Sequence, residues 1–328
     1  METLAINDLN VVFSTEAGPL HALKNVSFTV PEKRIVGIVG ESGCGKSTLI
    51  NAILGLLADN GRVESGAIRF EGTTDLVGLG PTQMRALRGE RISTVFQDPM
   101  GALNPVISVG KQMTNIQYRS GLSRAEKEAR AIEMLELVRI PDARTALKRY
   151  PHQFSGGMKQ RIAIAMALMM EPALLIADEP TTALDATLEV ATIELLKDLQ
   201  QKIGCSVLFI SHHLGVIAEL CEEVVVMYAG EVVERGSVRQ IFNDPRHPYT
   251  VRLLECDPAR QTSRVRHLPT IPGEIPDLRD RPHGCIFAPR CHRAHDACST
   301  PQAERDTGDG HFARCVLAND PEAIEATA

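Results

Sequence analysis

A glycine-rich segment between an apolar run and a helical pattern constrains the fold more than any other feature. Residues 40–48 read Gly-Glu-Ser-Gly-Cys-Gly-Lys-Ser-Thr, which is the pattern of a glycine, four residues, a glycine, a lysine and a serine or threonine. The apolar run 34–39 before this segment predicts a strand, and a helix is expected to continue through residue 57. A strand, a glycine-rich turn and a helix in this order open an α/β nucleotide-binding domain.

The residue types in this segment, the phosphate-binding loop, suit a nucleotide. Glycines let successive backbone N–H groups turn toward phosphate oxygens, and the following helix adds a partial positive charge at its N-terminus. Lys46 is expected to reach the β- and γ-phosphates, and the Ser47 hydroxyl to bind Mg²⁺. The predicted nucleotide contacts are Gly40, Ser42, Gly43, Cys44, Gly45, Lys46, Ser47 and Thr48.

The thiol of Cys44 lies inside this loop. A helix N-terminus and Lys46 nearby would lower its pKa, and we hypothesise that oxidation of Cys44 blocks ATP binding. The alternative is that Cys44 is a filler of the size of serine.

A second group of candidate residues follows a predicted strand at 173–177. The strand ends in Asp178 and Glu179. An acid at the end of a buried strand can hold Mg²⁺, which we assign to Asp178. Glu179 is then the general base that deprotonates the attacking water. The alternative is a solvated acidic pair.

Residues 154–161, Phe-Ser-Gly-Gly-Met-Lys-Gln-Arg, resemble the signature motif of ATP-binding-cassette (ABC) ATPases. Ser155 lies 109 residues after Lys46 (155 minus 46) and 23 residues before Asp178 (178 minus 155), as in that family. Phe154 and Met158 depart from the family's leucine and glutamine, whereas Ser155, Gly156 and Gly157 match. The resemblance implies an α/β P-loop ATPase with a RecA-like core and a helical subdomain. It also implies that the signature contacts ATP on an opposing subunit.

The same resemblance implies roles for four further residues. Gln97 is expected to touch Mg²⁺ and the attacking water, and Asp185 to lie in a loop that crosses the dimer interface. His212 is expected to bond the γ-phosphate, although His213 stands where the family has aspartate. Phe13 is expected to stack on the adenine ring. The alternative for Phe13 is a core aromatic of the first strand.

Composition excludes several classes of protein. The net charge is −6, aromatic residues make up 4% and tryptophan is absent, so we expect no nucleic-acid partner. The longest apolar run covers residues 162–170, whereas a membrane-spanning helix needs about 20 residues. The first residues lack a basic start and an apolar signal core, so the chain is expected to stay on the cytoplasmic side.

The composition changes near residue 254. Five prolines fall in residues 257–283, and Cys285, Cys291, Cys298 and Cys315 follow at spacings of five, six and sixteen intervening residues. We therefore predict an ABC ATPase domain at 1–255, with its helical subdomain at about 98–170, and a small, irregular, cysteine-rich domain at 256–328. Four thiolates in a module with little core suit a metal site. Zinc, free cysteines and disulfides are the alternatives, with His292, His295 and His311 as further candidate ligands.

Residues 245–250 and 281–291 resemble segments of oligopeptide and dipeptide importer ATPases. This resemblance implies a [4Fe–4S] cluster on the four cysteines. It implies an ATPase subunit, peripheral on the inner membrane, that works with a second, homologous ATPase in a heterodimer. Two transmembrane permeases and a periplasmic or extracellular binding protein complete such an importer. The alternatives are an importer of nickel, an oligosaccharide or an opine-like compound, and a soluble cassette ATPase acting on DNA or ribosomes.

Overall fold

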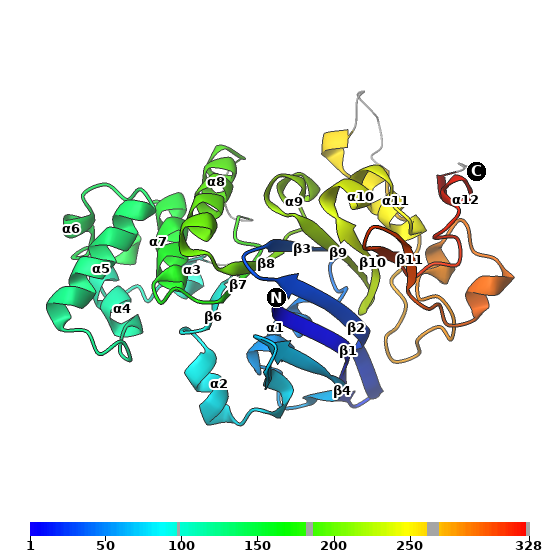
Figure 1. Cartoon of the computed structure of the whole chain (residues 1–328), viewed down its shortest axis with the longest axis horizontal. Coiled ribbons are helices and arrows are strands. Elements are labelled where there is room, and N and C mark those ends of the chain that lie inside the picture. The colour runs from blue at the N-terminus through cyan, green and yellow to red at the C-terminus, as the bar shows by residue number, and fades with distance from the viewer. Residues whose placement is uncertain (97–98, 182–185, 261–268, 326–328) are drawn as a thin grey trace. The chain divides into compact units, whose positions relative to one another are not determined.

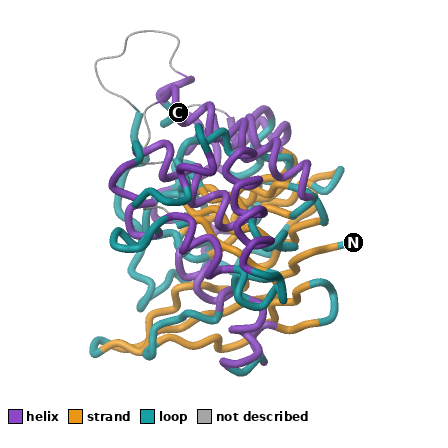
Figure 2. The backbone as a smooth tube through the Cα atoms, turned by 90° about the vertical axis from the view of Figure 1, so that its left-hand side faces the viewer, coloured by secondary structure: helices purple, strands orange, loops and turns teal. Residues whose placement is uncertain are grey.

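The computed structural model describes residues 1–96, 99–181, 186–260 and 269–325. These residues form two compact units. The first unit contains residues 1–30, 35–79 and 211–328, and the second contains residues 31–34 and 80–210. Figure 1 labels the elements, and Figure 2 colours the same backbone by secondary structure. The boundary after residue 255 stays a prediction.

The first unit holds both ends of the chain. Its elements are β1 (Glu2–Thr15), β2 (Gly18–Pro31), β3 (Ile35–Val39), α1 (Lys46–Leu54), β4 (Gly61–Phe70), β5 (Thr74–Asp75), η1 (Leu76–Gly78), α9 (Leu214–Leu220), β9 (Glu223–Tyr228), β10 (Glu231–Ser237), α10 (Val238–Asn243), α11 (Pro248–Glu255), η3 (Pro258–Arg260), η4 (Ala288–Arg290), η5 (Asp296–Ser299), β11 (Arg305–Gly308), β12 (His311–Ala313) and α12 (Pro321–Glu325).

Two sheets organise the first unit. Strands β2, β1, β4 and β5 form a four-stranded sheet in this order, in which β4 is antiparallel to β1. In the second sheet, β3 pairs in parallel with β9, and β9 pairs in antiparallel with β10. All five residues of β3 are buried, which explains why this strand is a continuous apolar run in the sequence.

The predicted helix after the phosphate-binding loop exists but is shorter than expected. Helix α1 begins at Lys46 and ends at Leu54 rather than at Leu57. Gly55 adopts a left-handed conformation with φ of 60° and closes the helix through hydrogen bonds to Ala52 and Asn51 carbonyls. The glycine therefore overrides the apolar pattern that continues beyond it.

The predicted separate domain at 256–328 is not confirmed. Strand β12 pairs with β10, Glu234 opposite Ala313, and β11 pairs with β12, so this part of the tail extends the sheet of the first unit. The segment 269–283 contains no helix, as its prolines predict.

The second unit consists mainly of helices. Its elements are α2 (Pro81–Leu87), β6 (Ile92–Val95), α3 (Pro99–Ala102), α4 (Val109–Ile116), α5 (Arg124–Leu137), α6 (Ala143–Ala146), η2 (Pro151–Gln153), α7 (Gly156–Leu168), β7 (Leu174–Asp178), α8 (Ala186–Ile203) and β8 (Ser206–Ile210). Between residues 99 and 170 the described regular elements are helices, and the bounds of the predicted helical subdomain, about 98–170, stay a prediction.

Strands β6, β7 and β8 of the second unit pair in parallel in this order. A capping box begins α5: the Ser123 hydroxyl accepts from the Glu126 N–H at 3.3 Å, and the Glu126 carboxylate accepts from the Ser123 N–H at 2.7 Å. Among the described residues, we find no helix with the length and apolar character that crossing a bilayer requires.

Candidate active site

The phosphate-binding loop follows β3 directly and leads into α1 in the first unit. Gly40 and Gly45 have φ of 153° and 106°, in the region that favours glycine. A Cβ on Gly40 would lie 2.1 Å from the Met227 carbonyl oxygen of β9, and one on Gly45 would lie 2.7 Å from the Leu23 side chain. Both positions therefore need glycine for conformation and for space.

This geometry predicts that Gly40→Ala displaces the loop. We expect ATP affinity to fall by at least about tenfold, because strain and a backbone clash act together. Gly78→Ala, outside the loop in the same unit, is the control: Gly78 has no positive φ, and nothing lies within 4 Å of its would-be Cβ. Nucleotide titration of both purified variants measures the difference, and equal affinities would contradict the packing argument.

Lys46 is held over the loop by the loop's own backbone. Its Nζ donates to the Gly40 carbonyl at 2.7 Å and to the Glu41 carbonyl at 3.1 Å. Ser47 and Thr48 follow in the first turn of α1, with Ser47 exposed. Lys46 and Ser47 therefore lie where the phosphate-binding loop meets α1. Their contacts with phosphate and Mg²⁺ stay predictions.

The burial and the pKa of the Cys44 thiol differ from what the sequence predicts. Its side chain is 1% exposed, and its backbone carbonyl accepts from the Gly230 N–H at 2.9 Å. Burial raises the pKa of the Cys44 thiol, and the nearby Lys46 only partly offsets this effect. The expected lowering of the pKa is therefore wrong, and the geometry favours the alternative of a buried filler.

His212 and Phe13 also belong to the first unit. The Ser211 N–H donates to the Ile38 carbonyl of β3 at 3.4 Å, so His212 leaves the sheet close to where β3 enters the loop. The His212 side chain is exposed, and its ring lies 4.3 Å from that of His213. Phe13 is half-buried in β1, and a Cβ on Gly61 would lie 2.5 Å from its ring.

The predicted acids lie at the end of β7 in the second unit. Asp178 is the last residue of the strand and is paired with Ile210 of β8. Glu179 follows with φ of 45°, and its N–H donates to the Ile210 carbonyl at 2.9 Å. A glutamate in the left-handed region is uncommon, and such conformations cluster at functional sites.

The predicted signature residues begin α7 in the same unit. Ser155 is the N-cap, and its hydroxyl accepts from the Met158 N–H at 3.3 Å. Ser155 and Gly156 are exposed, and Gly157 is buried against Leu188. The exposed Ser155 and Gly156 at this helix N-terminus are accessible to an anion. Gln97 and Asp185 lie outside the described residues.

The four tail cysteines line one small cavity in the first unit. Cys285, Cys291, Cys298 and Cys315 all contribute to its wall, together with His247 and Arg293. Backbone N–H groups of Arg293 and Leu317 donate to the Cys291 and Cys315 sulfurs, each at 3.4 Å. The four cysteines that the sequence offers as candidate metal ligands span 31 residues, and the fold brings them into one cavity wall.

Burial and neighbouring thiols both raise the pKa of three of these cysteines. Burial is the main cause that raises the pKa of Cys285, of Cys291 to about 11 and of Cys315 to about 12, and the neighbouring thiols add to it. Among the residues that the structure describes, no three His, Cys, Asp or Glu side chains are grouped so as to hold one metal ion.

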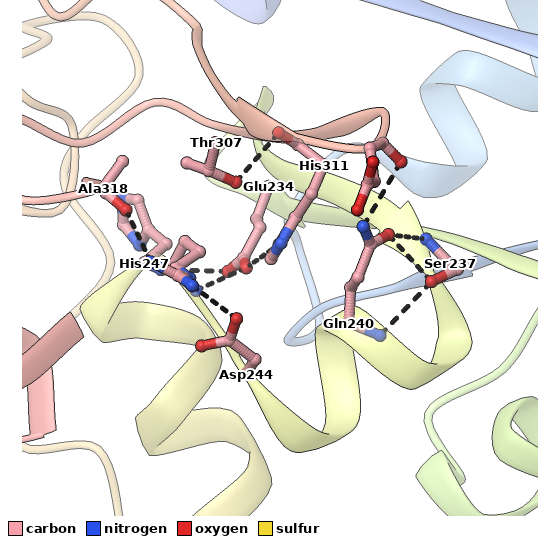
Figure 3. Close-up of polar contacts among 10 residues, drawn as sticks. Glu234, Ser237, Gln240, Asp244, His247, Thr307, His311 and Ala318 are labelled. Atoms are coloured by element: carbon pink, nitrogen blue, oxygen red, sulfur yellow. Dashed lines mark hydrogen bonds and ion pairs between the residues drawn. The ribbon is translucent and has the colours of Figure 1, made fainter. Parts of the chain in front are cut away.

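The histidines around this cavity are arranged differently from the sequence-based expectation. His311 Nε2 contacts the Glu234 carboxylate at 2.8 Å and does not line the cavity (Figure 3). His292 is exposed, and His295 Nδ1 lies 3.8 Å from the Cys298 sulfur. The histidine in the wall is His247, which spacing between cysteines could not indicate.

Comparison with known proteins places this geometry in a family. Residues 23–182 match the family model described as "ABC transporter", and residues 233–298 match "Oligopeptide/dipeptide transporter, C-terminal region". The oligopeptide transport ATP-binding protein OppD of Salmonella typhimurium is 43% identical, over 95% of this chain and 92% of that protein. The chain belongs to the ABC transporter ATPase family. This cassette ATPase binds and hydrolyses ATP.

Other relatives and solved structures agree with this assignment. The OppD protein of Bacillus subtilis is 47% identical to the ATPase, over 88% of this chain and 80% of that protein. A probable peptide ABC transporter ATP-binding protein of Sinorhizobium fredii is 46% identical, over 97% and 95%.

Solved structures of cassettes share the P-loop ABC fold. A dimeric ATP-binding cassette bound to ADP and phosphate, in a post-hydrolysis state, has a TM-score of 0.63 and 28% identity, over 72% of this chain and 99% of that chain. A component of the cbiONQ ABC transporter complex of Clostridium perfringens has a TM-score of 0.65 and 29% identity, over 77% and 95%.

Proposed function

We propose that this ATPase drives the uptake of dipeptides or oligopeptides through a membrane importer. The match of residues 233–298 to the C-terminal region of oligopeptide/dipeptide transporters carries the proposal, because this region lies outside the general cassette. Relatives named as peptide-transport ATP-binding proteins, matched over nearly the whole chain, support it. The ATPase would then work peripherally, on the cytoplasmic face, with two permeases, a second ATPase subunit and a binding protein.

In this proposal, hydrolysis depends mainly on positioning and electrostatics. Lys46 and the loop N–H groups would hold the phosphates, and Ser47, Asp178 and Gln97 would hold Mg²⁺, which would neutralise phosphate charge. Glu179 takes the proton of the attacking water, and His212 bonds the γ-phosphate.

The partner subunit completes each ATP site in the proposed pair of ATPases. Ser155, Gly156 and Gly157 would meet the γ-phosphate held by the other subunit's loop, with Asp185 at the interface. Phe13 would stack on adenine.

Reconstitution tests the proposed cargo. The ATPase is purified with the permeases and the second ATPase subunit encoded beside it, placed in proteoliposomes, and supplied with the neighbouring binding protein. We expect a dipeptide or oligopeptide to stimulate ATP hydrolysis several-fold. Stimulation by nickel, an oligosaccharide or an opine-like compound alone would overturn the peptide assignment, and hydrolysis without any permease partner would favour the soluble alternative.

We further propose that the cysteine cavity holds a [4Fe–4S] cluster, with Cys285, Cys291, Cys298 and Cys315 as its ligands. Three buried donor atoms, Arg293 Nε and Nη2 and His247 Nε2, have no hydrogen-bond partner among the described residues, which supports an anionic occupant. Because His247 Nδ1 accepts from the Tyr249 N–H at 3.0 Å, its proton lies on Nε2. Burial lowers the pKa of His247 to about 3, so the ring is a neutral donor.

Four cysteines that line one cavity suit the all-cysteine ligand set of an iron–sulfur cluster. Four thiolates on one zinc ion, with Zn–S bonds of about 2.3 Å, must crowd together tightly. The described side chains are not grouped for one ion, although all four sulfurs line one cavity. A cluster core of several iron and sulfide ions accommodates thiolates that are farther apart. Hydrogen bonds from backbone N–H groups to Cys291 and Cys315 suit such sulfur ligands.

Metal analysis of anaerobically purified protein tests this cluster. We expect about four iron and four sulfide ions per chain, with the brown colour of such clusters. Cys291→Ser is expected to lose most of the iron, whereas the matched control Cys256→Ser, outside the cavity wall, keeps it. Equimolar zinc without iron, or equal iron in the two variants, would contradict the proposal.

A further inference from the structure

Arg290 connects the cysteine-rich tail to the phosphate-binding loop. Its Nη1 and Nη2 donate to the two carboxylate oxygens of Glu41, at 2.8 and 3.1 Å. Its Nε donates to the Pro272 carbonyl and Nη2 also to the Ile271 carbonyl, each at 3.0 Å, and Nη1 contacts the Tyr228 hydroxyl at 3.3 Å. These contacts use all five N–H donors of the guanidinium, and the side chain is only 4% exposed.

Glu41 is held from two sides. Besides the carboxylate pair with Arg290, its N–H donates to the Tyr249 hydroxyl at 2.9 Å. Tyr249 packs against Tyr228 and Phe287, with ring centroids 4.7 and 5.4 Å away, and these three rings are fully buried. The second residue of the loop is thus fixed by α11, β9 and the tail, all within the first unit.

We propose that Arg290 is a positioning residue for ATP binding, which acts through Glu41. A carboxylate in a loop that receives phosphate groups repels them, and the bidentate arginine pair neutralises this charge and fixes the backbone that follows. The tail that carries the cysteines therefore also completes the nucleotide site. The inference rests on the ATPase activity of the chain and not on the proposed cluster or cargo.

A double-mutant cycle in the purified complex tests this role. Arg290→Ala leaves the Glu41 carboxylate unpaired, and we expect the KM for ATP to rise about tenfold with kcat within about twofold. Glu41→Gln alone removes the repelling charge but also breaks the bidentate pair, so we expect a rise in KM that is smaller than that of Arg290→Ala. The double variant is expected to recover part of the affinity that Arg290→Ala loses, because the unpaired charge is gone.

Structural damage to the tail gives a different pattern. It would lower kcat or stability as well, and Glu41→Gln would not rescue it. Arg290→Lys keeps the charge without the bidentate fork, so we expect an intermediate KM.

Arg279→Ala is the matched control, because Arg279 pairs with Asp277 on the surface of the same segment. A KM for ATP that stays unchanged in Arg290→Ala, or a double variant no better than the single one, would overturn the proposal. Iron content of each variant, measured alongside, separates a failure of this inference from a failure of the cluster assignment.

Discussion

ATP turnover is expected to fall by about 100-fold or more in Glu179→Gln, because a positioned general base contributes about 10²–10⁴-fold. The amide keeps the size and hydrogen-bonding reach of the side chain but cannot take the proton of the attacking water. ATP binding should persist, because the variant leaves unchanged the phosphate-binding loop and Lys46, which are expected to hold the phosphates. The backbone at Glu179 supports this role: a φ of 45° is uncommon for a glutamate, and such conformations cluster at functional sites.

Single-turnover hydrolysis and nucleotide titration in the assembled complex measure the two effects separately. Glu171→Gln is the matched control, because Glu171 lies just before β7, also has a positive φ, and pairs with Arg130 on the surface. We expect the control to hydrolyse ATP at the normal rate. Unchanged hydrolysis in Glu179→Gln would refute its assignment as the base.

Local signals in the sequence predict most of the elements that carry the site. Strands β3 and β8 are wholly buried and are apolar apart from Ser206 at the start of β8, so the residues that follow them are predictable as strand ends. The capping box at Ser123 and the glycine-rich loop act within a few residues. Local hydrogen bonding determines the capping box, and backbone conformation determines the loop. Both depend on residue types that are close together in the sequence.

Features that depend on distant contacts are not predictable in this way. The pair between Arg290 and Glu41 joins residues 249 positions apart. Likewise, β12 pairs with β10, which makes part of the tail a continuation of the sheet. The pKa of Cys44 was predicted with the wrong sign, because its neighbours in sequence are visible whereas its burial is not.

Glu234 is expected to be the most sensitive structural position of the tail region. Its carboxylate is fully buried and accepts from the Arg246 N–H at 2.6 Å, the His247 N–H at 3.0 Å and His311 Nε2 at 2.8 Å (Figure 3). Glu234→Ala leaves these groups buried without an acceptor. We expect the free energy of unfolding to fall by about 3 kcal/mol or more, measured by urea denaturation.

Glu234→Gln keeps the shape of the side chain and removes its negative charge, so it shows how much stability the charge contributes. Both carboxylate oxygens accept hydrogen bonds, so the amide must turn its NH₂ group toward at least one N–H donor, and part of the stability is lost. The matched control is Glu304→Gln, whose partly exposed pair with Arg235 is worth about 1 kcal/mol or less. Because Glu234 also fixes the backbone of His247, the same variant should loosen the wall of the cysteine cavity. Equal stability of the Glu234 and Glu304 variants would mean that this buried carboxylate does not hold the tail to β10.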